Sequence, residues 1–346
     1  MVEKWLCCPI IVVALLAIWG PIGSGQTSVL APLQPSPTKD IVFAVGDIVQ
    51  QGFEARAEAT GQLMKKSLDE NPGSIALLLG DNSNDDGSPE SFNRLDRTVW
   101  GELNSRYQGR IYAAMGNHER WFDKVNPFHF FYWYNSAFDS WGNDWFDLHR
   151  SGWRFFRVNS ETMARSHDLL QRMRRRETLE WFERELRRVP RDMCTAVFFH
   201  RPPFSSGNFA SPGWVMPLYR KMYRYGVDWW GAGHDHIRDS LPPLDPDGNV
   251  DWTYGIPGDI VGTGGAIPHS LADPRTGRLR EPRWKAYGEV VQVNALGILR
   301  LDVEPGKLQR QFIAVTREPG VEYPKTTITC HPNKPGYVES LDNPNP

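Results

Sequence analysis

Residues 41–47 read IVFAVGD, and residues 75–81 read IALLLGD. Each stretch is a short apolar run that ends in glycine and aspartate, at Asp47 and at Asp81. A continuous apolar run of this length is typical of a strand that is buried on both faces of its sheet, as in α/β proteins. The two stretches therefore predict buried strands that each deliver a carboxylate at the end of the strand.

Three more apolar runs, at residues 111–115, 196–199 and 227–230, are also followed by polar residues. The polar residues that follow them are Asn117, His118, His200, His234 and His236. In α/β proteins, functional sites gather at the carboxyl ends of strands, because the loops there converge on one edge of the sheet. The recurrence predicts an α/β fold whose polar site is built from five separate strand ends.

The segments between these runs indicate helices and closing strands. Residues 53–70 have helical composition, and residues 177–189 carry apolar side chains at helical spacing. The arginines at 174–176 fit a solvated helix face better than a nucleic-acid site. Residues 290–315 alternate apolar and polar side chains, which predicts antiparallel strands. The aromatic-rich residues 121–153 fit a packed insertion better than a wall of the site, although both readings are compatible.

The N-terminus has the pattern of an export signal. A lysine and an apolar run over residues 10–19 precede small residues at 23–25, which predicts a signal peptide over residues 1–25. The run is shorter than the ~20 apolar residues of a membrane span, so we expect no stable span once the signal is removed; an uncleaved anchor is the alternative. Residues 26–39 are expected to form a flexible lead-in, and the protein to be exported, either periplasmic or secreted.

Composition sets further limits. The chain has 346 residues, enough for one large domain or two ordinary ones. Its formal net charge of −2 gives no global field that would attract nucleic acid. After signal removal only Cys194 and Cys330 remain; they could pair in an oxidising compartment, and the sequence leaves this open. Nothing marks a surface for self-association, so the oligomeric state is not predicted.

The polar residues at the strand ends have the chemistry of a metal centre. Oxygen and imidazole donors together suit Zn, Mn or Fe, and six ligands are too many for one tetrahedral ion. Two ions, with one aspartate bridging them, can activate water and clamp the oxygens of a displacement at phosphorus. The six candidate ligands are Asp47, Asp81, Asn117, His200, His234 and His236. The isolated histidines His129, His149, His167, His269 and His331 are assigned to no site.

In this order along the chain, the motifs resemble those of the calcineurin-like metallophosphoesterases, in particular the branch similar to purple acid phosphatases. The motifs are Gly46-Asp47, Gly80-Asp81-Asn82, Gly116-Asn117-His118-Glu119, His200-Arg201-Pro202 and Gly233-His234-Asp235-His236. Residues 261–265, VGTGG, are similar to a segment common in bacterial members. The resemblance implies one catalytic domain over residues 40–316, a two-sheet β-sandwich flanked by helices. The Pro-rich, polar composition of residues 317–346 predicts a loosely held tail.

The resemblance also implies a role for each residue. Asp47 and His236 would hold the first ion, Asp81 would bridge, and the second ion would bind Asn117, His200 and His234. His118 would lie beside the phosphate and either bind it or donate a proton to the leaving group. Arg201 and Asn117 would help to bind the substrate.

The sequence departs from the family pattern in three places. Asn84 stands where the purple branch has a tyrosine, and Val49 stands where the wider superfamily often has a histidine. A neutral amide does not stabilise a trivalent ion as a phenolate does, so we expect two divalent ions without purple colour, with Asn84 as a possible additional ligand. Ile237-Arg238 replaces a Tyr-Glu pair of many relatives and leaves the rim of the site undefined.

The implied activity is hydrolysis of phosphomonoesters, an acid-phosphatase-like reaction in which a metal-bound hydroxide attacks phosphorus. The alternatives are a phosphodiesterase or nucleotide hydrolase of the same fold, because loops outside the motifs decide whether a second ester group is admitted. A third alternative is a binding or scaffold homologue with impaired catalysis. The expected partner is a small phosphate ester.

Overall fold

The structure is a computed structural model, and it describes residues 39–119, 142–164, 168–272, 275–278, 290–315 and 323–331. All of these residues belong to one compact unit that begins at residue 38. The expected signal peptide, the lead-in except for its last residue, and residues 121–141 of the aromatic-rich segment lie outside the described residues. Among the described helices, none is both long and apolar enough to cross a membrane.

The first sheet has six strands in the order β13-β12-β11-β1-β2-β3. Its parallel part consists of β1 (Asp40–Val45), β2 (Ile75–Leu78) and β3 (Ile111–Ala113). Its antiparallel part consists of β11 (Gly297–Glu304), β12 (Lys307–Ala314) and β13 (Thr326–Thr329). The apolar runs that end at Asp47 and Asp81 are thus neighbouring central strands, which brings their carboxyl ends together.

The second sheet has seven strands in the order β10-β8-β9-β7-β6-β5-β4. The parallel centre is formed by β5 (Trp153–Arg157), β6 (Cys194–Phe198), β7 (Trp229–Ala232) and β9 (Ile256–Val261). Antiparallel strands flank it, namely β4 (Asp144–Leu148), β8 (Ile237–Leu244) and β10 (Val290–Val293). The expectation of antiparallel closing strands in residues 290–315 is confirmed by β10, β11 and β12.

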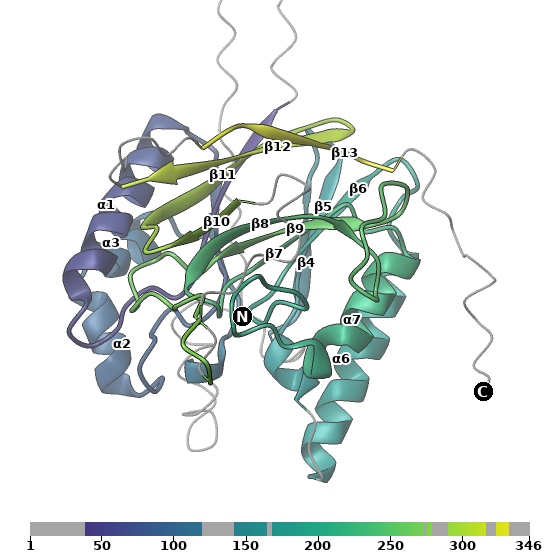
Figure 1. The fold of residues 1–346 in the computed structure, drawn as a ribbon. Coiled ribbons are helices and arrows are strands. Elements are labelled where there is room, and N and C mark those ends of the chain that lie inside the picture. Colours follow the sequence, from purple (N-terminus) through teal and green to yellow (C-terminus); the bar gives the residue numbers. More distant parts are fainter. Residues whose placement is uncertain are drawn as a thin grey trace, which may run out of the picture. The chain divides into compact units, whose positions relative to one another are not determined.

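Three apolar clusters hold the layers together. Between the sheets, Ala44 and Leu77 pack with Phe198 and Trp229 from the opposite sheet. On the outer face of the first sheet lie α1 (Glu54–Glu70), α2 (Pro89–Asp96) and α3 (Val99–Arg106), and on that of the second lie α6 (Leu169–Arg187) and α7 (Pro212–Arg224), as Figure 1 shows. The predicted two-sheet sandwich flanked by helices is therefore confirmed.

The helix predicted over residues 177–189 is longer than expected. It begins at Leu169, because Asp168 caps it by accepting a hydrogen bond from the Leu170 backbone N–H at 3.0 Å. The first turn carries exposed apolar side chains, which gave no helical pattern in the sequence. Phe182 and Leu186 are buried, as the spacing predicted.

The expectation of a loosely held tail after residue 316 is wrong for residues 323–331. Within them, β13 pairs with β12 in antiparallel register, and Cys330 forms a disulfide with Cys194 at the start of β6. Cys194 and Cys330 therefore do pair, which the sequence alone left open. Residues 317–322 and 332–346 of the tail lie outside the described residues.

Candidate metal centre

Three of the candidate ligands leave their strands through a left-handed backbone. The φ angles are 58° at Asp47, 48° at Asp81 and 70° at His234. This conformation costs a residue with a Cβ roughly 1–2 kcal/mol, so the conformation persists only where surrounding contacts impose it. Here the backbone N–H of Asp47 donates to Gly80 O at 3.0 Å, and that of His234 donates to Asp47 Oδ2 at 2.8 Å. These hydrogen bonds impose the left-handed backbone and so fix the direction in which the side chains leave the sheet edge.

Glycines before the ligands allow the strand ends to approach one another. A Cβ at Gly80, whose φ is 86°, would lie 2.6 Å from Nδ1 of His200. A Cβ at Gly233 would lie 2.6 Å from Asp47 Oδ2 and 3.5 Å from His200 Nδ1. Because glycine has no Cβ, positions 80 and 233 leave room for the side chains of His200 and Asp47, and ligands from different strands can approach one another.

At the second-ion position, three atoms of metal-ligand type converge. His200 Nδ1 lies 2.9 Å from Leu79 O, and since a carbonyl only accepts, this nitrogen carries the proton. The other nitrogen, His200 Nε2, lies 3.0 Å from Asn117 Oδ1 and 3.2 Å from Asp81 Oδ2. Asp81, His200 and His234 each offer a ligand atom, and all three atoms lie within 4.8 Å of one another. A carboxylate oxygen, an amide oxygen and imidazole nitrogens that converge in this way fit a cation, either a proton on His200 or a metal ion that replaces it.

The electrostatics of this group favour a positive charge. Burial lowers the pKa of His200, but the Asp81 carboxylate outweighs it and raises that pKa to about 9. Burial, together with the positive His200 and Arg201, holds the pKa of His234 well below its usual range. His234 is therefore neutral, the form in which histidine binds metals.

At the first-ion position, Asp47 and His236 show the same arrangement. His236 Nδ1 lies 2.6 Å from Ile267 O and therefore carries the proton, which leaves a lone pair on Nε2. His236 Nε2 lies 3.2 Å from Asp47 Oδ1, a buried oxygen with no other hydrogen-bond partner among the described residues. A buried acceptor without a donor is costly, so the oxygen and nitrogen present here fit a metal ion.

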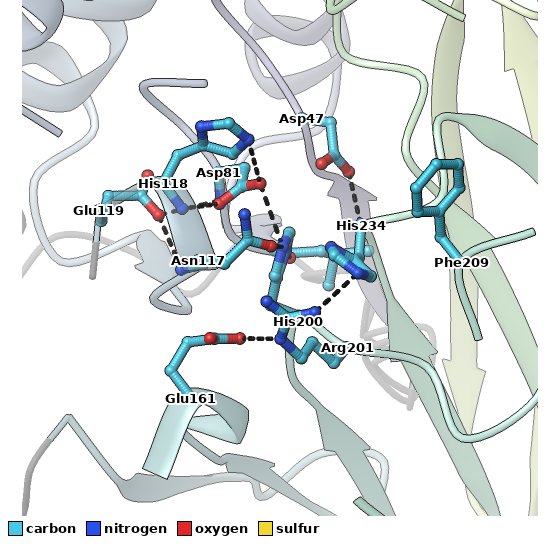
Figure 2. A network of polar contacts seen from close by, with 12 residues as sticks. Asp47, Asp81, Asn117, His118, Glu119, Glu161, His200, Arg201, Phe209 and His234 are labelled. Carbon is cyan, nitrogen blue, oxygen red and sulfur yellow. Dashed lines mark hydrogen bonds and ion pairs between the residues drawn. The ribbon is translucent and has the colours of Figure 1, made fainter. Parts of the chain in front are cut away.

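His118 and Asn117 come from the same turn after β3. The His118 backbone N–H donates to Asp81 Oδ1 at 2.9 Å, and its Nδ1 lies 2.5 Å from Asp85 O. Its Nε2 is 3.6 Å from Asp81 Oδ2 and its side chain is 22% exposed. His118 thus lies at the open side of the ligand group, with one nitrogen fixed by the protein and the other directed toward Asp81 (Figure 2).

Glu119 was missed as a functional residue. Its buried carboxylate accepts four backbone hydrogen bonds, from Gly116 at 2.7 Å, Asp81 at 3.0 Å, Asn82 at 2.5 Å and Ser83 at 3.1 Å. It thereby ties the loop after β3 to the loop that carries Asp81. The motif Gly-Asn-His-Glu contained the signal, since its glutamate follows two candidate site residues directly.

Comparisons with known proteins agree with this geometry. The family model described as calcineurin-like phosphoesterase matches residues 27–238. The chain belongs to the calcineurin-like phosphoesterase family. No curated protein matches its sequence.

Solved structures with the same fold include phosphatases. A purple acid phosphatase from yellow lupin seeds is 15% identical with a TM-score of 0.58, over 85% of this chain and 55% of the lupin protein. A dimetal phosphatase from Danio rerio is 11% identical with a TM-score of 0.52, over 85% of this chain and 100% of that protein. The GAP50 anchor of the Plasmodium inner membrane complex is 12% identical with a TM-score of 0.58, over 84% of this chain and 89% of that protein.

In this phosphoesterase, Arg201 lies against the ligand group. Its Nε donates to Glu161 Oε1 at 2.7 Å, one Nη lies 2.8 Å from His234 Nε2, and its guanidinium lies 4.3 Å from the centre of the Trp214 ring. Glu161 is on the short 3₁₀ helix η1 (Ser160–Met163) and was not predicted, because no motif surrounds it. Arg201 is therefore held at the centre and is not a free surface arginine.

Asn84 lies in the loop after Asp81, which accepts backbone hydrogen bonds from the loop after Asp47, for example from Ile48 N–H to Asp81 O at 3.0 Å. Its backbone N–H donates to Val49 O at 2.8 Å, and its side-chain oxygen is buried without a hydrogen-bond partner among the described residues. The residue thus joins the loop after Asp81 to the loop after Asp47 through its backbone.

Of the isolated histidines, His269 lies beside the phosphoesterase centre although the sequence gave it no role. Its ring stacks on that of His236 at 3.9 Å, and its Nδ1 lies 3.1 Å from Asp235 Oδ1. His331 pairs with Asp228 at 3.0 Å, and His149 lies in the turn after β4. His129 and His167 lie outside the described residues.

Proposed function

We propose that the chain is a metal-dependent phosphatase that hydrolyses phosphomonoesters. The observation that carries the proposal is the convergence of three ligand atoms, since His200 Nε2 lies 3.0 Å from Asn117 Oδ1 and 3.2 Å from Asp81 Oδ2. Membership of the phosphoesterase family and the likeness of the fold to phosphatases support the reaction class.

The chain's own side chains would hold two divalent ions, Fe, Mn or Zn. Asp47 and His236 would bind the first ion, Asn117, His200 and His234 the second, and Asp81 would bridge. When bound, such a pair of ions supplies Lewis acidity at the phosphate oxygens and lowers the pKa of water. Since Leu79 O and Ile267 O hold the ring protons of His200 and His236 on Nδ1, both rings keep Nε2 available for the ions.

Two cationic or proton-carrying groups border the ligands on the open side. His118 has its Nδ1–H bound to Asp85 O, so Nε2 is the atom that can hydrogen-bond the phosphate or move a proton to the leaving group. Arg201 is oriented by Glu161 and presents its guanidinium beside His234, where it can bind a phosphate oxygen. Both groups act on the substrate only if the phosphate lies over the ligand cluster.

The test compares p-nitrophenyl phosphate with its bis-ester across pH, with Mn, Zn or Fe supplied, alongside elemental analysis. We expect two metals per chain and faster hydrolysis of the monoester. A preference for the bis-ester would favour a phosphodiesterase or nucleotide hydrolase. A protein that binds no metal and hydrolyses neither ester would favour a scaffold role.

The buried amide at position 84 carries a proposal about the metals. Because Asn84 offers a neutral oxygen in place of a phenolate, the loaded protein should hold divalent ions and show no tyrosinate-to-iron colour. The visible spectrum of an iron-loaded sample measures this directly, and a strong absorption band would contradict it. The matched variant Asn84→Tyr should introduce such a band.

We further propose that the protein is exported and acts on small phosphate esters outside the cytoplasm, on the evidence of the N-terminal sequence. Mass determination of the protein recovered outside the cytoplasm should give a chain that begins near residue 26. Recovery only in the cytoplasmic fraction at full mass would contradict export.

A further inference from the structure

A column of three stacked rings stands beside the metal centre. The ring of His236 stacks on that of His269 at 3.9 Å and 9°, and His269 stacks on Phe209 at 4.0 Å and 30°. Phe209 also lies 6.1 Å from His234, edge to face. Phe209 is thus in ring contact with one candidate ligand and joined to another through His269.

The loop that carries Phe209 is tied down. The Phe209 backbone N–H donates to Asp235 Oδ2 at 3.3 Å, and Ser205 Oγ donates to the same oxygen at 2.6 Å. Asn208 donates from Nδ2 to the carbonyls of Ser270 and Ala272, both at 2.9 Å. The ring is therefore held in place relative to the ligands, so a bound group would pay little to order it.

Phe209 remains 42% exposed although it stacks on His269. Ile267, whose carbonyl oxygen binds His236, is 45% exposed. Single exposed apolar side chains are common on proteins and carry no meaning alone. Here an immobilised aromatic ring faces solvent directly beside a cluster of charged and polar side chains. The apolar ring suits the organic leaving group of an ester, whereas the charged and polar side chains suit its phosphate.

Figure 2 shows His118 and Phe209 on opposite sides of the ligand cluster, with His200 and His234 between them. A phosphate over the ligands would therefore have His118 on one side and an apolar surface on the other. Since the charged end of a phosphomonoester is attracted by the histidine side, the organic end is left to face Phe209.

We propose that Phe209 is a stacking platform for the leaving group, so that the preferred substrates are phosphomonoesters whose leaving group carries a flat aromatic ring. The proposal rests on the proposed phosphatase function. It also assigns His118 to the phosphate rather than to the leaving group, because the leaving group departs on the far side. Aromatic pairs prefer offset or edge-on contacts with centroids about 4.5–7 Å apart, which one exposed face of Phe209 permits.

The experiment uses substrate pairs that differ in the ring. Adenosine 5′-phosphate and ribose 5-phosphate share the same ester linkage, and only the first carries an aromatic base. Phenyl phosphate tests a ring attached directly to the ester oxygen, which separates an aryl source from a nucleoside source. For each substrate kcat/KM is compared between the wild-type protein and the variants, so differences in intrinsic reactivity cancel.

Phe209→Ala should lower kcat/KM about ten-fold for adenosine 5′-phosphate or phenyl phosphate, as expected for one lost aromatic contact, and leave ribose 5-phosphate nearly unchanged. Phe209→Trp should retain the preference. Trp252→Ala is the matched control, because this residue is also an exposed aromatic, 71% exposed. It follows the far end of β8, whereas His236 directly precedes the start of that strand. That variant should change none of the three values.

A binding measurement gives a readout that does not depend on turnover. Calorimetry with phenylphosphonate and methylphosphonate should show tighter binding of the aromatic compound to the metal-loaded protein, and Phe209→Ala should remove the difference. Equal losses for aromatic and non-aromatic ligands would overturn the proposal about Phe209. Absence of hydrolysis of every ester by the wild-type protein would instead overturn the phosphatase function.

Discussion

The strands β6 and β7 have buried polar groups at both ends, and the two ends are built in opposite ways. At the carboxyl ends, His200 Nε2 faces the acceptors of Asp81 and Asn117. At the amino ends, Asp228 accepts hydrogen bonds from the backbone N–H groups of Thr195 at 2.7 Å and of His331 at 2.9 Å. Burial of a carboxylate therefore does not identify a site, whereas the convergence of oxygen and imidazole ligand atoms from separate strand ends does.

The amino end also shows how a ligand-like group can be structural. Cys194, Asp228 and Cys330 place their side-chain atoms as close together as metal ligands. Their sulfur atoms are bonded to each other in the disulfide, so they are not available to an ion. The carboxyl end is thus built for chemistry and the amino end for stability, and changes at the two ends should have separate effects.

The largest expected effect is on turnover, from Asp81→Ala. Removal of this carboxylate takes a ligand from the second-ion position and the acceptor from the His118 backbone N–H, so activity should fall by at least ~100-fold, the scale seen when even outer partners of a metal site are lost. Steady-state kinetics and metal content measure it. Asp228→Asn is the control at the opposite end and should keep its activity. Equal loss of activity in both variants would break the comparison.

The next effect is on stability, from Cys330→Ser. The disulfide joins residues 136 apart in sequence, so its loss should lower the free energy of unfolding by about 2–5 kcal/mol while turnover is retained. Denaturant unfolding of the oxidised wild-type protein and the variant gives the difference. Addition of reductant should bring the wild-type protein toward the variant. Unchanged stability would show that the amino end does not depend on the bridge.

Glu119→Gln should weaken metal binding by about 10–100-fold. The amide offers one acceptor oxygen where the carboxylate offered two, so part of the four backbone N–H groups loses its partner and the Asp81 loop is no longer fixed. Titration of the metal-free protein with Zn or Mn measures the affinity. Glu102→Gln, an exposed glutamate that pairs with Lys65, is the control and should bind metal as the wild type does.

The smallest expected effect lies on the outer face of the second sheet, at Glu183. Burial raises the pKa of this carboxyl, but hydrogen bonds from Lys221, Arg187 and Tyr225 outweigh it and lower the pKa from 4.5 to about 2. Because the folded-state pKa is depressed, the stabilisation is present above about pH 4.5 and is lost as the pH falls toward 2. The Glu183 side chain is 22% exposed and its partner Arg187 is 53% exposed, so solvent screens the charges and we expect only about 1 kcal/mol.

Unfolding of Glu183→Gln measured at pH 7 and near pH 3 checks this pH dependence. The destabilisation relative to the wild-type protein should shrink at the lower pH. Glu180→Gln, which removes an exposed ion pair with Arg176, should have no comparable effect. A destabilisation that does not change with pH would point to lost packing instead of lost charge.

Much of the fold was predictable because the central strands are buried on both faces. The runs before Asp47 and Asp81 are apolar for that reason, and they form neighbouring parallel strands as expected. By contrast, β13 reads TTIT and only Ile328 is buried, since the strand lies at the sheet edge. Such a strand has no apolar run to reveal it, and its pairing depends on a partner far away in sequence.

The site was predictable where a ligand follows its strand within a motif. The structure brings Asp81, Asn117, His200 and His234 together, as their positions after strands suggested. Glu161, Phe209 and His269 could not be placed, because each reaches the centre through loop contacts between residues distant in sequence. Stacking of His269 on His236, for example, depends on the path of the loop after β9, which no local pattern specifies.

The disulfide has a consequence for how the chain is assembled. Ribosomes deliver the polypeptide from its N-terminus, so Cys194 emerges long before Cys330. Until Cys330 has been made, the thiol of Cys194 has no native partner and can react with oxidants or with other thiols. The yield of native protein should therefore depend on the thiol and disulfide chemistry of the compartment in which the chain folds.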